Sequence, residues 1–484
     1  MNFGVANRLD HGDYAVILAV TLAFFGGCLA FAALAHFVGS RFDTGLISAA
    51  SFAMCIFLYG DFSRALQFIG SPKLILALWL AASMTLVVLV RRLWTIPGGA
   101  TALQLLSLTL LVSPVVLSLG AAPTPGTNGR EVLRTPPPSL ASGLYRPNVY
   151  LISHDSYLRA DALATFYGFD NRAFTNRLSA LGFLLPSRSY ANYNFTNLSL
   201  TTELGMNYVL STAAEHKALL GTLKISGETE AATQFKRRGY TYIFANNGFF
   251  GSLKCSAFND VCLNPQTSSY ELYGALLDLT PAGWIVTNPS VYSSYTVDRL
   301  TDFEPRKQRQ PFLFVLHTVG LHNFDWDADC RYRPPTHLVG WSTPPSPPLF
   351  LIKRAYVDQI QCVNRMTLAA VESLLARDPE AIMIIQADHG TWSIGGLRSR
   401  PRKDWMATRE ADELFAILNA YRLPARCRRL LYDTISPVNS FRVVLSCIDG
   451  IDYPLLPDRH FLMSGPEWNG HPFFEEVSFN GQRP

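Results

Sequence analysis

Charged side chains are scarce in this 484-residue chain and form no basic stripe. They make up only 16% of the residues, against 49% hydrophobic residues, and the formal net charge is +4. Soluble domains typically carry about 25% charged residues, so the composition is not that of an ordinary soluble enzyme. The lack of a basic stripe excludes nucleic acid from the expected partners. The chain shows no internal repeat.

Four long apolar runs lie in the first quarter of the chain. They cover Tyr14–Val38, Thr44–Tyr59, Lys73–Val90 and Thr101–Ala121. Each has about the length needed to cross a hydrocarbon core, although the second is marginal. No basic segment precedes the first run, which argues against a cleaved signal peptide. We therefore expect a bundle of four transmembrane helices within residues 1–121.

The positive charges that flank these runs predict the orientation of the protein. Arg91 and Arg92 lie between the third and fourth runs, and Arg41 lies between the first and second. Because Lys and Arg are enriched on the cytoplasmic side of a membrane, these loops should be cytoplasmic. The prediction is a multi-pass protein of the inner (plasma) membrane, with its large C-terminal part outside the cytoplasm.

Cysteine usage gives an independent indication of the compartment. The chain has eight cysteines, of which six lie in the C-terminal part. An even set of six in a non-cytosolic domain indicates up to three disulfides. The neighbours along the chain are Cys255 and Cys262, Cys330 and Cys362, and Cys427 and Cys447. The alternative is a cytoplasmic domain with free thiols.

The rest of the chain has the pattern of an α/β domain. A linker rich in Pro, Gly and Ser at residues 122–147 separates the apolar runs from a domain at 148–484. We expect strands at 148–153, Tyr240–Ala245, Pro311–His317 and Ala381–Gln386, and helices at Arg172–Leu181, Leu198–Leu210 and Ile352–Ala376. Strands that alternate with helices predict a mostly parallel sheet covered by helices on both faces.

Acidic side chains follow two of the predicted strands. Asp388 and His389 come directly after the strand at 381–386, in "QADHG", and Asp155 follows the strand at 148–153. Ligands bind at the carboxyl ends of strands in open α/β sheets, and Zn²⁺ and similar ions take imidazole nitrogen and carboxylate oxygen. Loops of this kind can converge on one ion. The ordinary alternatives are a turn at Asp-His-Gly and a helix N-cap at Asp155.

A hydroxyl group, that of Thr196, precedes the predicted helix at Leu198–Leu210. Thr at this position commonly caps a helix. The start of a helix also has free N–H groups and the positive end of the helix dipole, which hold phosphate or sulfate. A Thr hydroxyl activated by a metal ion would be a nucleophile facing an anion site. The sequence leaves both roles open.

Three histidines lie near these predicted strand ends. His317 ends the strand at 311–317, and His322 follows in its loop. Either can bind a metal ion, carry a proton or hold an anionic substrate, although single histidines are often structural. His154 directly precedes Asp155, and the sequence does not assign it a role.

The order of these features resembles the alkaline phosphatase/sulfatase superfamily. Within it, the chain is similar to the membrane-anchored, LTA-synthase-like and phosphoethanolamine-transferase-like branch, in which transmembrane helices carry an extracytoplasmic sulfatase-like domain. The resemblance spans roughly residue 148 to the C-terminus. It rests on "YGFDNRAFTNRLSALGF", "NYNFTNLSLTTELGMNY", "LHTVGLHNFDWDADC", "DHG", "FAILNAYRLP" and "SPVNSFRVVL".

This resemblance implies a set of site residues. Asp155, Thr196, Asp388 and His389 would hold one divalent ion, and Thr196 would also be the nucleophile. The ion would be Zn²⁺ or Mn²⁺, with Mg²⁺ as a third candidate. His322 matches a substrate-contacting histidine of relatives, and His322 or His317 would supply acid–base help.

The nucleophile sets the expected reaction. Sulfatases of the formylglycine type have Cys or Ser in a Cys-x-Pro-Ser-Arg context, which none of the cysteines here has, and "LLPSR" at 184–188 has Leu184 in that place. A Thr nucleophile favours a phospho-enzyme. The expected enzyme transfers phosphoethanolamine or phosphoglycerol from a membrane phospholipid to an envelope glycan or lipid. A metal-dependent phosphoester or sulfoester hydrolase and a non-catalytic glycan-binding module remain alternatives.

Overall fold

The structure is a computed structural model, and it describes most of the chain from residue 145 onwards and part of what precedes it. The described residues are 25–34, 41–60, 72–101, 145–209, 227–245, 255–263, 297–319, 326–331, 349–391, 410–464, 473–479 and the single residues 22, 36, 37, 62, 66, 225, 247, 280 and 321. They fall into two compact units. The helices before residue 102 belong to one unit, and the described residues from 145 onwards, apart from Thr280, belong to the other.

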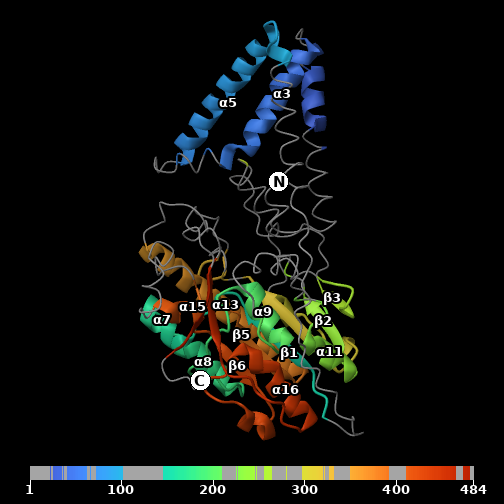
Figure 1. Ribbon diagram of the computed structural model, residues 1–484, viewed down its shortest axis with the longest axis vertical. Helices are drawn as coiled ribbons and strands as arrows, with labels where there is room; N and C mark the ends of the chain where they lie inside the picture. The colour runs from blue at the N-terminus through green and yellow to red at the C-terminus, as the bar shows by residue number, and fades with distance from the viewer. Residues whose placement is uncertain are drawn as a thin grey trace. The chain divides into compact units, whose positions relative to one another are not determined.

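Helices make up the first unit (Figure 1). Helix α3 (Phe42–Phe57) packs against helix α5 (Pro72–Thr95). The Trp79 indole donates a hydrogen bond to the Cys55 carbonyl over 3.2 Å, and its ring meets that of Tyr59 edge to face, with centroids 5.3 Å apart. The large apolar side chains of α5 are mostly exposed, as expected for a helix in contact with lipid.

One helix in this unit meets the requirements of a membrane span. Within the described residues, Lys73–Thr95 is the stretch long and apolar enough to cross a bilayer. A shorter apolar helix, Phe25–Leu34, lies within the first predicted span, whose residues 14–21 are outside the described residues, and another, Phe42–Phe57, overlaps the second. The fourth, Thr101–Ala121, lies outside the described residues except for Thr101. The four-helix bundle and the multi-pass topology therefore remain predictions.

A six-stranded sheet organises the second unit. Its strands are β1 (Val149–His154), β2 (Thr241–Ala245), β3 (Val261–Leu263), β4 (Phe312–Thr318), β5 (Ile382–Ala387) and β6 (Asn419–Arg422). They lie in the order β3-β2-β4-β1-β5-β6, and all neighbours are parallel except β5 and β6. The mostly parallel sheet is confirmed. Each of the four predicted strands begins one residue later than expected.

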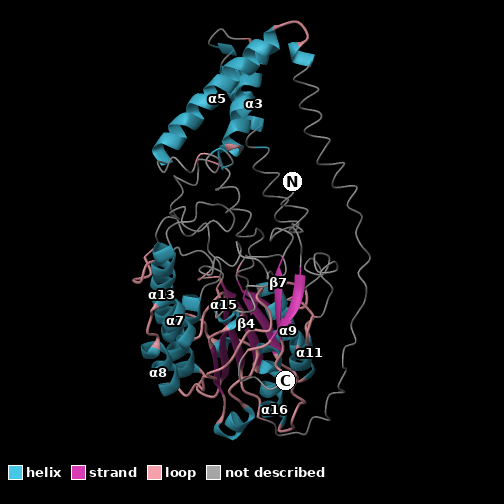
Figure 2. Cartoon of the chain, turned by 60° about the vertical axis from the view of Figure 1, so that its left-hand side comes forward, coloured by secondary structure: helices cyan, strands magenta, loops and turns pink. Residues whose placement is uncertain are grey.

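Helices cover both faces of this sheet, as predicted (Figure 2). One face carries α7 (Ala160–Tyr167), α8 (Arg172–Ala180) and α13 (Leu349–Arg377); the other carries α9 (Thr196–Gly205), α11 (Glu230–Arg237) and α16 (Ser440–Asp449). The core on the first face joins alternate strand residues, such as Tyr150 and Phe314, to α13 residues such as Ile360. Strands that are buried on both faces have nearly continuous apolar sequences, and this pattern allowed the sequence to predict them.

Smaller elements complete the unit. They are α15 (Glu410–Phe415), the antiparallel pair β7 (His460–Ser464) and β8 (Phe473–Val477), and the short 3-10 helices η5 (Val297–Thr301), η6 (Pro305–Lys307), η8 (Ala425–Leu430) and η9 (Pro437–Asn439). Sequence patterns did not predict them, because each is short. Helix α15 leads into Ala416 and Ile417, which form isolated bridges with Tyr190 and Leu158.

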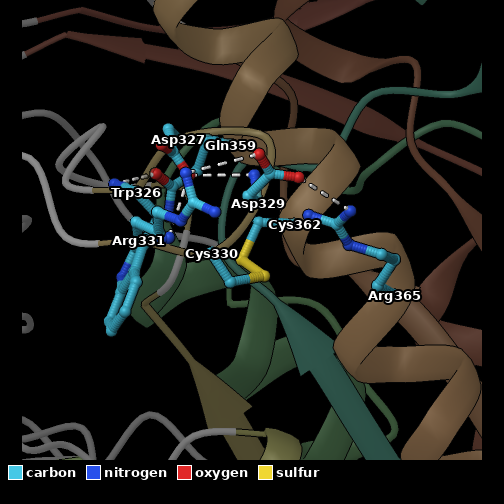
Figure 3. The surroundings of a disulfide bond; sticks show 8 residues. All are labelled: Trp326, Asp327, Asp329, Cys330, Arg331, Gln359, Cys362 and Arg365. Carbon is cyan, nitrogen blue, oxygen red and sulfur yellow. Dashed lines mark hydrogen bonds and ion pairs between the residues drawn. A yellow bond between two sulfur atoms is a disulfide. The ribbon is translucent and has the colours of Figure 1, made fainter.

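Three disulfides are present, in agreement with the predicted maximum of three, and each joins cysteines that are neighbours along the chain. They are Cys255–Cys262, Cys330–Cys362 and Cys427–Cys447. Figure 3 shows the second, which ties the segment 326–331 to α13. The backbone N–H of Trp326 donates a hydrogen bond to Oε1 of Gln359, which also lies on α13, over 2.7 Å. Disulfides form in oxidising compartments, in agreement with an extracytoplasmic domain.

Candidate metal centre

Two neighbouring strands place the carboxylates of the site. Asp155 directly follows β1, and Asp388 directly follows β5. The Asp155 N–H donates to the Thr318 carbonyl (2.9 Å), and the Asp388 N–H donates to the His154 carbonyl (3.2 Å). These bonds continue the sheet ladder by one residue. Both side chains are fully buried, so the sheet itself fixes where the carboxylates lie.

Three side chains converge on the ring nitrogen Nε2 of His389. Thr196 Oγ1 lies 3.2 Å from it, Asp388 Oδ2 3.6 Å and Asp155 Oδ1 3.7 Å. Ligands that each lie about 2.0–2.1 Å from a tetrahedral Zn²⁺ are roughly 3.3 Å apart. The observed spacings are close to this value, and Asp155, Asp388 and His389 are the group of described residues arranged to hold a metal ion. The donor set of two carboxylates, one imidazole and one hydroxyl fits a divalent ion.

The backbone after His389 orients its ring. Nδ1 lies 2.6 Å from the Gly390 carbonyl, and this contact requires the proton on Nδ1. The lone pair of Nε2 then points toward the other three groups, as in most metal-binding histidines. A Cβ on Gly390 would lie 2.0 Å from the Glu413 carbonyl oxygen. Gly390 is therefore required by this close approach, which accounts for the third residue of "DHG".

Neither capping alternative from the sequence holds in the structure. Helix α9 begins at Thr196 itself, and the cap position is Phe195, whose side chain makes no capping bond. The Thr196 hydroxyl instead contacts His389. Helix α7 begins at Ala160, with Arg159 rather than Asp155 at its cap position. Because the first N–H groups of a helix have no carbonyl partner within it, Thr196 lies at the anion-binding end of α9.

Hydrogen bonds favour the ionised form of Asp388. Its Oδ1 accepts the N–H groups of Ser156 (3.1 Å) and His389 (2.8 Å), and its Oδ2 contacts His317 Nε2 at 3.2 Å. Burial opposes ionisation, but the neighbouring imidazole groups of His389 and His317 outweigh it, so the pKa of Asp388 lies below its usual value. An ionised carboxylate is the form that binds a cation.

His317 is brought to the site, whereas His322 lies outside the described residues. His317 Nδ1 lies 3.0 Å from the Asn247 amide nitrogen, which also donates to the His317 carbonyl. An amide N–H can only donate, so the His317 proton belongs on Nε2, where it faces Asp388. Both ring nitrogens are thus engaged. In this geometry His317 orients a carboxylate, and its predicted role in proton transfer stays a prediction.

His154 points away from the site, into the core beneath α13. Its ring contacts the hydroxyls of Thr318 (2.9 Å) and Thr367 (3.1 Å). Burial, with a smaller contribution from His317, lowers the pKa of His154 to about 3, so the ring is neutral at physiological pH. It therefore joins β1 to β4 and α13 rather than binding an ion.

Two further residues at the site were missed by the sequence analysis. Asn247 follows β2 by two residues, so a wider search for polar side chains just past each predicted strand would have found it. Ser156 contacts both carboxylates, but next to Asp155 it reads as an ordinary turn residue. In the string "LLPSR", Ser187 and Arg188 bind the surface residue Asp433.

Fold and site together define an α/β protein with a candidate metal and hydroxyl centre at the carboxyl edge of its sheet. A profile of the sulfatase family matches residues 147–421. This match covers more than half of the chain and includes Asp155, Thr196, His317, Asp388 and His389. The chain therefore belongs to the sulfatase family, which confirms the resemblance inferred from its motifs.

Solved structures with similarity to the chain include proteins of this superfamily. The C-terminal periplasmic domain of EcEptC from Escherichia coli is 13% identical, with a TM-score of 0.41, and the match covers 70% of this chain and 93% of that one. Lipooligosaccharide phosphoethanolamine transferase A from Neisseria meningitidis is 14% identical (TM-score 0.41; coverage 64% and 56%). A protein in the alkaline phosphatase superfamily from Vibrio parahaemolyticus is 15% identical (TM-score 0.39; coverage 66% and 73%). No curated protein matches the chain.

Proposed function

We propose that this protein is a membrane-anchored, metal-dependent phosphotransferase. It would take a phosphoethanolamine or phosphoglycerol group from a phospholipid and pass it to an envelope glycan or lipid through a phospho-threonine at Thr196. The observation that carries the proposal is the convergence of the Thr196 hydroxyl with Asp155, Asp388 and His389 at the start of α9. A hydroxyl nucleophile beside a cation site and a helix N-terminus is suited to phosphoryl transfer.

The reaction has two displacements at phosphorus. In the first, Thr196 Oγ1 loses its proton and bonds to the donor phosphorus, the bond from phosphorus to the diacylglycerol oxygen breaks, and that oxygen takes up a proton. In the second, an acceptor hydroxyl bonds to phosphorus and loses its proton, while the Thr196 oxygen leaves and is reprotonated. His322, which comes after β4 in the sequence, is the candidate for moving these protons.

The residues of the chain hold and orient the reacting groups. A bound divalent ion would lower the pKa of the Thr196 hydroxyl and neutralise phosphoryl oxygens. Asp155, Asp388 and His389 would hold that ion, and Gly390 and His317 fix the orientation of its ligands. The N–H groups at the start of α9 would supply hydrogen-bond donors to the phosphoryl group.

The identity of the nucleophile separates this proposal from sulfate-ester hydrolysis. Formylglycine is made from Cys or Ser, and Thr196 cannot supply it. The helix Lys73–Thr95 supports a donor that resides in the bilayer. A hydrolase would use the same residues, with water in place of the acceptor hydroxyl, so the two reactions must be separated by their products.

The test uses the full-length protein in detergent with a phospholipid labelled in its head group. Wild type should carry the label on the peptide that contains Thr196, as read by peptide mass spectrometry after rapid quenching. Thr196→Ser retains a hydroxyl and should be labelled, whereas Thr196→Ala should not. Release of the free head group without acceptor would indicate the hydrolase. Absence of both label and turnover in wild type would leave the non-catalytic alternative.

A further inference from the structure

We infer that Ser156 is a positioning residue that sets both carboxylates of the candidate metal centre. The inference rests on the metal site of the proposed function and adds a residue to it. Ser156 directly follows Asp155 and is buried. It contributes through two different groups, its backbone N–H and its hydroxyl.

Each of these groups binds a different carboxylate. The Ser156 N–H donates to Asp388 Oδ1 over 3.1 Å, and the Ser156 hydroxyl donates to Asp155 Oδ1 over 2.7 Å. The two acidic residues are 233 positions apart along the chain. Ser156 connects them at the carboxyl edge of the sheet. Rotation of either carboxylate would break one of these bonds.

The backbone of Ser156 adopts an unusual conformation to make these contacts. Its φ angle is 57°, in the left-handed region that residues other than Gly rarely adopt. Neighbours hold it there: the Tyr356 hydroxyl donates to the Ser156 carbonyl (2.7 Å) and accepts the Leu158 N–H (3.2 Å). Strained backbone is found where the surrounding structure requires it, often at functional sites. Here it turns the N–H toward Asp388.

The hydroxyl also determines which atoms of Asp155 remain available. It occupies Oδ1, whereas the buried Oδ2 has no hydrogen-bond partner among the described residues. A buried carboxylate oxygen without a donor is costly, and a cation removes that cost. Ser156 therefore fixes the rotation of the Asp155 carboxylate, with Oδ1 3.7 Å from His389 Nε2 and Oδ2 left without a donor from the described residues.

Two substitutions separate the hydroxyl from the backbone strain. Ser156→Ala removes the hydroxyl and keeps a side chain that disfavours positive φ. Ser156→Gly removes the hydroxyl and suits positive φ. Both keep the N–H that binds Asp388. The matched control is Ser153→Ala, which removes another buried hydroxyl three residues earlier that has no hydrogen-bond partner in the described part of the chain.

The measurement is the affinity of the full-length, metal-free protein in detergent for Zn²⁺ and for Mn²⁺, in competition with a chelator. Both Ser156 variants should bind about 10- to 100-fold more weakly than wild type, the usual effect of losing a residue that orients a ligand, while Ser153→Ala should bind as wild type does. Thermal unfolding of the metal-free proteins verifies folding, and Ser156→Gly should unfold no earlier than Ser156→Ala.

The outcomes distinguish this inference from the proposed function. Wild-type affinity in both Ser156 variants would overturn the role of Ser156 and leave the metal site standing. Weak metal binding in Ser156→Ala but not in Ser156→Gly would assign the effect to backbone strain. This result would also overturn the role of the Ser156 hydroxyl. Failure of wild type itself to bind either ion would reject the metal site and, with it, the inference.

Discussion

At the level of the single residue, both ring nitrogens of His317 have a hydrogen-bond partner, which bears on whether His317 orients a ligand or transfers a proton. Asn247 lies against Nδ1, and Asp388 lies against Nε2. A ring that is held on both sides resembles the residues that orient a metal ligand, whereas a proton carrier needs a free nitrogen. The structure therefore offers a specific test between orientation and proton transfer.

Substitutions of His317 should affect metal binding according to whether they retain a donor. In His317→Gln the side-chain amide can occupy the place of Nε2 and donate to Asp388. His317→Leu has no donor, and we expect it to bind Zn²⁺ or Mn²⁺ about 10- to 100-fold more weakly. Affinity and turnover should fall together and remain higher in the Gln variant. A Gln variant that binds metal normally but is as inactive as the Leu variant would instead indicate proton transfer.

Glu203 is a second buried residue whose charge can be tested. It lies on α9, two helical turns after Thr196, and is 1% exposed. Burial first, and the charge of Asp388 second, raise the pKa of its carboxyl well above the usual value. Its Oε1 has no hydrogen-bond partner among the residues described. The folded protein therefore favours the protonated form of this side chain.

Glu203→Gln should stabilise the metal-free protein, and more at pH 8 than at pH 5. Because the pKa of Glu203 is raised in the folded protein, the free energy of unfolding is unaffected by this residue below its unfolded-state pKa, about 4.3. The free energy of unfolding then decreases as the pH rises toward the folded-state pKa of Glu203. Gln cannot ionise and avoids this loss. Thermal unfolding would detect it, since about 1 kcal/mol shifts Tm by roughly 2–4 °C in domains of 150–250 residues. The exposed Glu228→Gln is the control, and an equal gain at both pH values would refute the account.

At the level of elements, the ends of strands determine how much of the site the sequence reveals. The apolar runs that became β1 and β5 located Asp155 and Asp388, because buried parallel strands end at one edge of the sheet. The order of the strands could not be predicted, because it depends on contacts between distant segments. The role of Ser156 could not be predicted either, because it depends on a φ angle that no residue pattern specifies.

The three disulfides should differ in what they contribute to stability. Cys330–Cys362 closes a separation of 32 residues and Cys255–Cys262 one of 7. The loss of chain entropy in the unfolded state grows with loop length, so replacing both cysteines by Ser should cost about 3–4 kcal/mol for the first and about 2 kcal/mol for the second. Chemical denaturation of the two double variants tests this order, and a larger loss at Cys255–Cys262 would contradict it.

At the level of the whole molecule, the proposal requires the α/β unit to lie outside the cytoplasm. On a background with Cys28→Ser and Cys55→Ser, Ser179→Cys places a thiol on the exposed surface of α8. A membrane-impermeant maleimide should label it in cells whose plasma membrane is intact. Arg41→Cys, on the side expected to be cytoplasmic, should be labelled only after lysis. The reverse pattern would place the α/β unit in the cytoplasm.

The central claim is that Asp155, Thr196, Asp388 and His389 hold one divalent ion, and metal stoichiometry tests it most directly. Full-length protein would be stripped with a chelator, reloaded with Zn²⁺ or Mn²⁺, freed of excess ion and analysed by elemental mass spectrometry. We expect close to one ion per chain in wild type and in Asp329→Asn, which removes an exposed carboxylate, and far less in Asp388→Asn. Wild type that retains neither ion, or Asp388→Asn that retains as much as wild type, would contradict the account.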